Sequence, residues 1–98
     1  MKYIFSSKAE DDFKQIYRYI TQESVLSAER VIANIETTCD ALSEMPEMGK
    51  KSEFVNDLLI RVFPVKKYGS YLIFYKITSK QLIVVRILHS AQDIPNIF

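Results

Sequence analysis

The sequence predicts an α+β domain in which an antiparallel sheet packs on an N-terminal helical hairpin, in the order β-α-α-β-β-β. Apolar residues recur every three or four positions through residues 7–45, as in amphipathic helices. Short β-branched and aromatic runs follow from residue 58, and the connections between them are too short to contain helices. The 98 residues, of which 48% are hydrophobic, suffice for one core, so residues 1–98 are expected to form a single domain.

The first elements are a strand and a helix. Residues 2–5 are apolar, aromatic and β-branched, which indicates a strand. Ser7 and Glu10 have the spacing of a capping box, in which each side chain binds a free backbone N–H of the first turn. We therefore expect a helix from Ser7 to about Gln22. Its acidic side chains, Asp12 among them, are expected on the solvated face.

A second, longer helix is expected to begin after Ser24 and to end at Pro46. Only a few residues separate the two helices, so they are expected to pack as an antiparallel hairpin with both apolar stripes on one core. Cys39 belongs to the second stripe and is the only cysteine. We expect an inert core thiol, because one cysteine cannot form an internal disulfide.

The second half of the chain is expected to form a loop followed by a sheet. Residues 46–57 contain proline, glycine and polar residues, which indicates a connecting loop. Strands are expected at residues 58–65, 71–78 and 82–88. Because their connections are short, the three strands are expected to form an antiparallel meander.

The last two expected strands are apolar on both faces and do not alternate. Such strands normally lie between two layers, but this chain offers only one pair of helices. Residues 91–98 are expected to cover part of the second face by folding back over it, and a segment of a partner protein is expected to cover the remainder. The residues expected to bind that partner are Leu72, Phe74, Leu82, Val84 and Leu88.

The two halves of the chain carry opposite charge. Residues 1–48 hold five bases and nine acids, whereas residues 49–98 hold eight bases and three acids. The second half therefore offers a positive field to a nucleic acid or to an acidic peptide. No apolar run approaches the ~20 residues that span a bilayer, and no secretory signal is present, so a cytoplasmic location is expected.

Few residues suit catalysis. His89 is the only histidine, and it is a candidate either for proton transfer or for a simple hydrogen bond at a strand end. Arg61 and Arg86 lie within apolar strands, where each guanidinium must bind a carboxylate or reach the surface. Asp93 is the expected partner of Arg86, and contact with an acidic partner or target is the alternative. No metal cluster or glycine-rich phosphate loop is present, so we expect no metal and no cofactor.

Residues along almost the whole chain fall in an order and spacing shared with a known family. In chain order they are Ala9, Asp12, Ile16, Tyr19, Ile20, Leu42, Pro46, Gly49, Arg61, Tyr71, Ile73, Phe74, Tyr75, Arg86, Ile87, Leu88, His89 and Asp93.

As an ordered set, these residues make the chain resemble the ParE/RelE toxin superfamily of type II toxin–antitoxin pairs. RelE-like members cut mRNA on the ribosome with basic residues and usually a tyrosine or histidine near the C-terminus, whereas ParE-like members inhibit DNA gyrase. This chain has no tyrosine after Tyr75, and its segment from Arg86 to His89, followed by Asp93, is similar to the ParE ending.

The resemblance therefore implies a gyrase inhibitor that is not an enzyme, with Arg61, Arg86, His89 and Asp93 as contacts to the target. The alternative it leaves open is a ribosome-dependent mRNA endoribonuclease in which His89, Arg61 and Arg86 form a cleavage site. A third possibility is an inactive relative that binds only its antitoxin. The resemblance also implies neutralisation by a cognate antitoxin that wraps the sheet and helices, together with roles in growth arrest and plasmid stabilisation.

Overall fold

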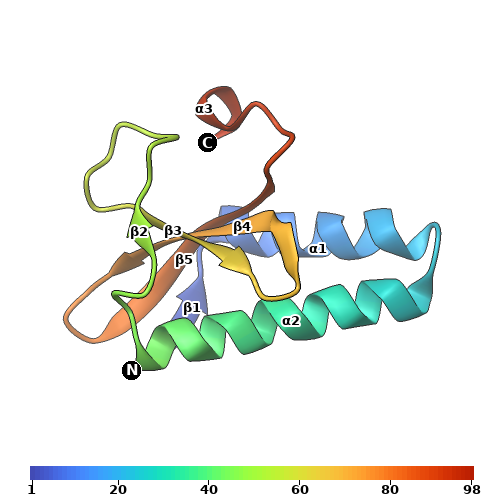
Figure 1. The fold of residues 1–98 in the computed structure, drawn as a ribbon, viewed down its shortest axis with the longest axis horizontal. Coiled ribbons are helices and arrows are strands. Elements are labelled where there is room, and N and C mark those ends of the chain that lie inside the picture. Colours follow the sequence, from blue (N-terminus) through green and yellow to red (C-terminus); the bar gives the residue numbers. More distant parts are fainter.

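The computed structural model describes all residues, 1–98, and confirms the α+β class with an N-terminal helical hairpin (Figure 1). All six expected elements are present, and a two-residue strand and a short C-terminal helix are added. The elements are β1 (Lys2–Phe5), α1 (Ser7–Thr21), α2 (Val25–Glu44), β2 (Lys50–Lys51), β3 (Arg61–Val65), β4 (Tyr68–Ile77), β5 (Gln81–His89) and α3 (Ile94–Ile97).

The sheet has the strand order β1-β5-β4-β3-β2. The meander of β3, β4 and β5 is antiparallel, as expected, and β2 adds an antiparallel edge. The sheet is not antiparallel at its other edge, because β1 pairs with β5 in parallel. This pairing joins the two ends of the chain, and no local pattern in the sequence specifies its direction.

The first helix begins at Ser7, as expected, but its N-cap lies one residue earlier than the capping box predicted. Ser6, not Ser7, is the N-cap, and its Oγ accepts a hydrogen bond from the N–H of Ala9 at 3.1 Å. Ser6 also donates from its backbone to Val84 O at 2.9 Å and from its hydroxyl to Val85 O at 2.9 Å. These bonds to β5 determine where the strand ends and the helix begins. The cap of α2 at Ser24 is confirmed.

The two helices cover one face of the sheet, and the main core lies between the helices and the sheet (Figure 1). Buried positions on α1 and α2 repeat at the expected helical spacing. The core residues are Ala9, Ile16, Val31, Ile35, Cys39, Leu42, Val65, Ile73, Tyr75, Leu82, Val84 and Ile87. None of the helices has the length and apolar character that crossing a membrane requires.

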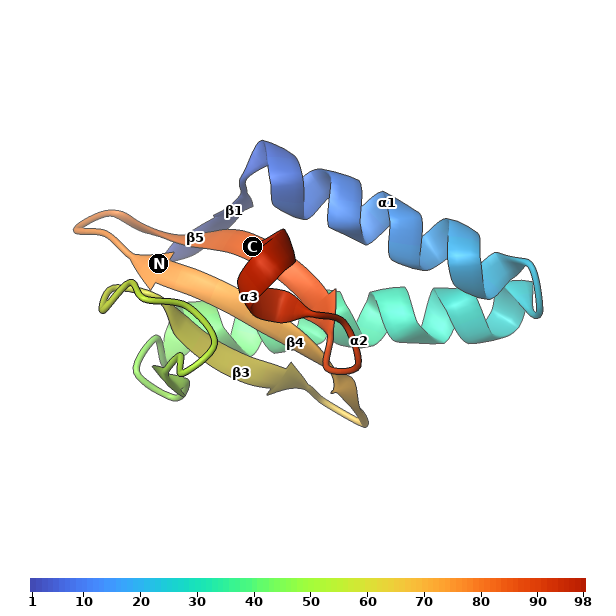
Figure 2. The same cartoon turned by 90° about the horizontal axis from the view of Figure 1, so that it is seen from above.

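A second, smaller core covers the opposite face of the sheet. There α3 lies over β4 and β5, and the β2–β3 loop lies beside it (Figure 2). Phe74 is fully buried between Phe54 of that loop and Phe98 of the tail, and both contacts are edge to face. The members of this second core are Ile60, Val62, Phe74, Leu88 and Ile94, with Val55, Leu72, Val85 and Phe98 packed against them.

Ile94 and Phe98 of the C-terminal segment cover part of this face, as expected, but the expectation that the remainder stays open is wrong. Phe74, Leu82 and Val84 are 0% exposed, Leu88 is 3% exposed, and Leu72 is half-buried. The β2–β3 loop and the C-terminal helix supply the missing second layer, because together they bury enough apolar surface to shield the strands.

The side-chain alternation of β5 also differs from the expected pattern. Val85 is an extra residue in the ladder, because Phe74 pairs with Arg86 while Tyr75 pairs with Val84. This bulge reverses which face each later residue occupies. Leu82 and Val84 consequently belong to the main core, whereas Leu88 belongs to the second core.

Candidate functional site

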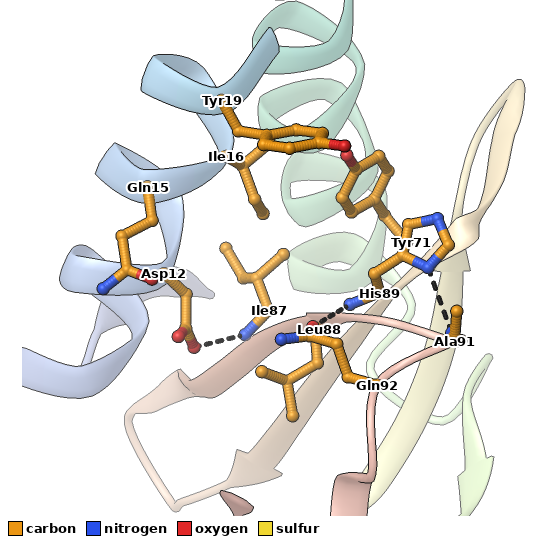
Figure 3. A pocket seen from close by; sticks show the side chains of 10 residues that line it. All are labelled: Asp12, Gln15, Ile16, Tyr19, Tyr71, Ile87, Leu88, His89, Ala91 and Gln92. Carbon is orange, nitrogen blue, oxygen red and sulfur yellow. Dashed lines mark hydrogen bonds between the residues drawn. The ribbon is translucent and has the colours of Figure 1, made fainter.

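A pocket of about 500 Å³ opens between α1 and the end of β5 (Figure 3). Its lining includes the apolar residues Ile16, Ile87 and Leu88. Its remaining walls come from α1, β4, β5 and the turn after β5. They are formed by Asp12, Gln15, Tyr19, Tyr71, His89, Ala91 and Gln92.

Two tyrosines and the single histidine meet at this pocket. Tyr71 pairs with His89 across β4 and β5, and their rings meet edge to face with centroids 5.0 Å apart. Tyr19 of α1 is 69% exposed, and its hydroxyl points toward that of Tyr71 (Figure 3). Burial raises the pKa of Tyr71, and the neighbouring Tyr19 adds to the shift. At neutral pH the Tyr71 phenol is therefore uncharged.

The turn after β5 orients the imidazole of His89. Its Nδ1 accepts a hydrogen bond from the N–H of Ala91 at 3.0 Å, and its backbone N–H donates to Oε1 of Gln92 at 2.7 Å (Figure 3). Because Nδ1 is an acceptor, the neutral ring carries its proton on Nε2. His89 therefore makes the strand-end hydrogen bond expected of a structural residue, while its other nitrogen has no partner within the chain.

Asp12 is buried, which corrects the expectation that it lies on a solvated face. Its Oδ2 accepts hydrogen bonds from Nε of Arg86 at 2.8 Å and from the N–H of Ile87 at 3.0 Å, and its Oδ1 accepts from Nη2 of Arg86 at 2.9 Å. The hydrogen bonds to Asp12 raise the pKa of Arg86. The pairing of β1 with β5 ends at Val84, so the N–H of Ile87 has no strand beside it. The Asp12 carboxylate accepts this hydrogen bond instead.

Asp93 does not pair with Arg86, so that expectation is wrong. The third nitrogen of the guanidinium, Nη1, donates to the carbonyl of Ile97 at 2.6 Å and to that of Phe98 at 3.4 Å. Asp93 instead stands at the N-terminus of α3, where its Oδ2 accepts a hydrogen bond from Nδ2 of Asn96 at 2.6 Å. Arg86 thus joins α1, β5 and the C-terminal segment.

Arg61 lies in β3, next to the edge strand β2. Its Nη1 donates to the carbonyl of Gly49 at 2.6 Å and to that of Glu47 at 3.4 Å. The same loop is held by Tyr75, whose hydroxyl donates to Pro46 O at 2.7 Å and accepts from the N–H of Gly49 at 2.9 Å. Arg61 therefore binds backbone carbonyls and no carboxylate, and it is half-buried, so that its guanidinium reaches the surface, which is one of the two environments that the sequence suggested.

The structure does not bring Arg61, Arg86 and His89 together. Arg61 pairs with Tyr75 and His89 pairs with Tyr71, four residues farther along β4, which is about 13 Å along the strand. Arg86 pairs with Phe74, on the face of the sheet that carries the second core. Of these three residues, only His89 lines the pocket, and the one charged side chain in its wall is that of Asp12.

Reasoning from the sequence missed three residues of this site. Asp12 lies three residues after Ala9 and four before Ile16, so helical spacing alone places it on the buried stripe. Tyr19 follows Ile16 by three residues, which places it on the same side of the helix, at the rim of the pocket, although it is exposed. The pairing of Tyr71 with His89 has no such signal, because it depends on the register of two strands.

Comparison with known proteins agrees with this fold. The model of the family described as "ParE toxin of type II toxin-antitoxin system, parDE" matches residues 3–94. Toxin RelE2 of Caulobacter vibrioides is 32% identical over 89 residues, which are 91% of this chain and 94% of that protein. A solved chain from the chromosomal ParDE toxin–antitoxin system of P. aeruginosa has the same fold, with a TM-score of 0.74 at 18% identity over 91% of this chain and 95% of that chain. Because the family match spans nearly all of the sequence, this chain belongs to the ParE toxin family of type II toxin–antitoxin systems.

Proposed function

We propose that this toxin acts by binding and inhibiting DNA gyrase, without catalysing a reaction. The observation that carries the proposal is the separation of Arg61, Arg86 and His89. Cleavage of a phosphodiester needs positive groups aimed at the charge that develops in the transition state. Here both guanidinium groups bind other parts of the chain, and no cation lines the pocket beside His89.

The proposed contacts to gyrase are His89, Asp93 and Arg61. Asp93 is exposed, and His89 and Arg61 are half-buried with nitrogen atoms that have no partner in the chain. Arg86 was expected to touch the target as well, but all three of its guanidinium nitrogens donate within the chain. We propose that Arg86 acts indirectly, by holding the C-terminal segment that carries Asp93.

A ribosome-dependent mRNA endoribonuclease is the second candidate. The observation that favours it is the position of His89, which stands with Tyr19 and Tyr71 in the wall of an open pocket. In that function His89 would act as general acid or base, and its removal would reduce cleavage by roughly 10²–10⁴-fold.

Two assays run side by side distinguish these functions. One measures DNA supercoiling by gyrase, and the other maps cleavage of translated mRNA by primer extension. We expect inhibited supercoiling with intact mRNA, and we expect His89→Ala to weaken the inhibition. Glu29→Gln, an exposed change on α2, serves as the matched control and is expected to have no effect.

Codon-dependent mRNA cleavage that His89→Ala abolishes, with normal supercoiling, would refute the proposal. An inactive chain would inhibit neither process and would not arrest growth when expressed alone. Gyrase and ribosomes are both cytoplasmic, so we propose that the toxin acts in the cytoplasm, where its antitoxin neutralises it.

A further inference from the structure

Two adjacent leucines in the β2–β3 loop are more exposed than any other large apolar side chain in the chain. Leu58 is 79% exposed and Leu59 is 71% exposed. Their loop stands on the face of the sheet opposite α1 and α2, next to α3 (Figure 1). Phe54 of the same loop and Ile97 of α3 are also exposed, at 39% and 40%. Neighbouring exposed apolar side chains of this kind mark interaction surfaces.

The turn that carries the two leucines is held in place by the residues on either side. Oδ1 of Asp57 accepts a hydrogen bond from the N–H of Leu59 at 2.9 Å, and Oδ2 pairs with Nζ of Lys76 at 3.4 Å. On the other side Ile60 is buried in the second core, and its N–H donates to Asp57 O at 3.1 Å. Because the backbone is already ordered, a partner that covers the leucines has little conformational entropy to remove.

The charge near the turn indicates the chemistry of the partner. Lys50 and Lys51 of β2 are exposed and pair with Val62 and Arg61 of β3, directly after the leucine turn. Residues 50–61 hold the three bases Lys50, Lys51 and Arg61 against the two acids Glu53 and Asp57, and Asp57 is already paired with Lys76. An apolar turn beside two exposed, unpaired lysines fits a segment with apolar side chains flanked by carboxylates.

We propose that Leu58 and Leu59 are the apolar anchors for an acidic segment of the antitoxin. This assignment replaces the buried strand residues expected from the sequence, because Phe74, Leu82 and Val84 are not accessible to a partner in this fold. The proposal rests on the pairing of ParE-family toxins with an antitoxin and does not depend on the target being gyrase.

The test compares two double variants of the full chain. Leu58→Ser/Leu59→Ser removes the proposed anchors, and Val25→Ser/Leu26→Ser removes two apolar side chains that are 55% and 56% exposed at the start of α2. Affinity is measured by calorimetry with the antitoxin encoded beside the toxin gene. Thermal unfolding of each variant checks the fold, and inhibition of supercoiling is measured on the same samples.

We expect the Leu58/Leu59 variant to bind the antitoxin roughly 100-fold more weakly, as the loss of two buried leucines predicts. The Val25/Leu26 variant is expected to stay within about threefold of the unsubstituted chain. Unchanged affinity of the Leu58/Leu59 variant would overturn the proposal. The proposal would also be overturned if this variant still bound the antitoxin but no longer inhibited supercoiling, because the leucines would then bind the target. If the unsubstituted chain fails to inhibit gyrase, the gyrase proposal falls while the affinity comparison stands.

Discussion

Replacing Asp12 by alanine is expected to destabilise the protein more than any other change to an α1 carboxylate. The carboxylate accepts three hydrogen bonds, two from Arg86 and one from the N–H of Ile87, at 2.8–3.0 Å. The side chains of Arg86 and Asp12 are only 13% and 9% exposed. Removing one partner of a buried ion pair costs about 3–5 kcal/mol, and the slight exposure favours the lower value, about 3 kcal/mol.

Chemical and thermal unfolding measure this loss directly. For a domain of this size, about 3 kcal/mol corresponds to a fall in the melting temperature of roughly 12–24 °C. Hydrogen exchange adds a local readout, because Arg86 also binds the carbonyl of Ile97. Once Arg86 has lost Asp12, amides near residues 94–98 are expected to exchange faster than those at the centre of β4.

Two further variants test the cause of the effect. Asp11→Ala removes an exposed carboxylate from the same turn and is expected to change the free energy of unfolding by less than about 0.5 kcal/mol. Asp12→Leu combined with Arg86→Met removes both charges, so its cost is expected to be well below the sum of the two single changes. A cost below about 1 kcal/mol for Asp12→Ala, or strictly additive costs in the cycle, would show that Asp12 and Arg86 do not form a stabilising buried ion pair.

Two more predictions concern the loop after α2 and the buried thiol. In Gly49→Ala the new Cβ would overlap the Tyr75 hydroxyl. The free energy of unfolding, measured in urea, is therefore expected to fall by about 1–3 kcal/mol. Tyr75→Phe alone removes the hydroxyl that binds Gly49 and Pro46, so the cost of combining it with Gly49→Ala is expected to be less than the sum of the two single costs, and strictly additive costs would contradict the steric explanation. Burial raises the pKa of Cys39 from 9.0 to about 12, so its contribution to stability is constant below pH 9 and declines as the pH rises from 9 to 12. Between pH 8 and pH 10 the free energy of unfolding is expected to fall by about 1 kcal/mol more in the unsubstituted chain than in Cys39→Ala, and equal slopes would contradict this.

Much of the fold was predictable because its signals are local. The apolar stripes of both helices, the Ser24 cap and the three late strands agree with the structure. The first cap was displaced by one residue because Ser6 is bound to β5, which is distant in the sequence. For the site, His89 was identified as the one side chain suited to proton transfer, but the residues that surround it were not.

The α+β class, the order of the long elements and the family were predictable without the structure, since they depend on residue periodicity and motif order along the chain. Three features appear only in the folded chain: the bulge at Val85, the covering of the second sheet face by the β2–β3 loop, and the pairing of Asp12 with Arg86. Each depends on which distant segments lie side by side, and side-chain alternation carries no information about that. One extra residue in β5 exchanges the faces of everything after it, so the surface offered to a partner is a property of the folded chain.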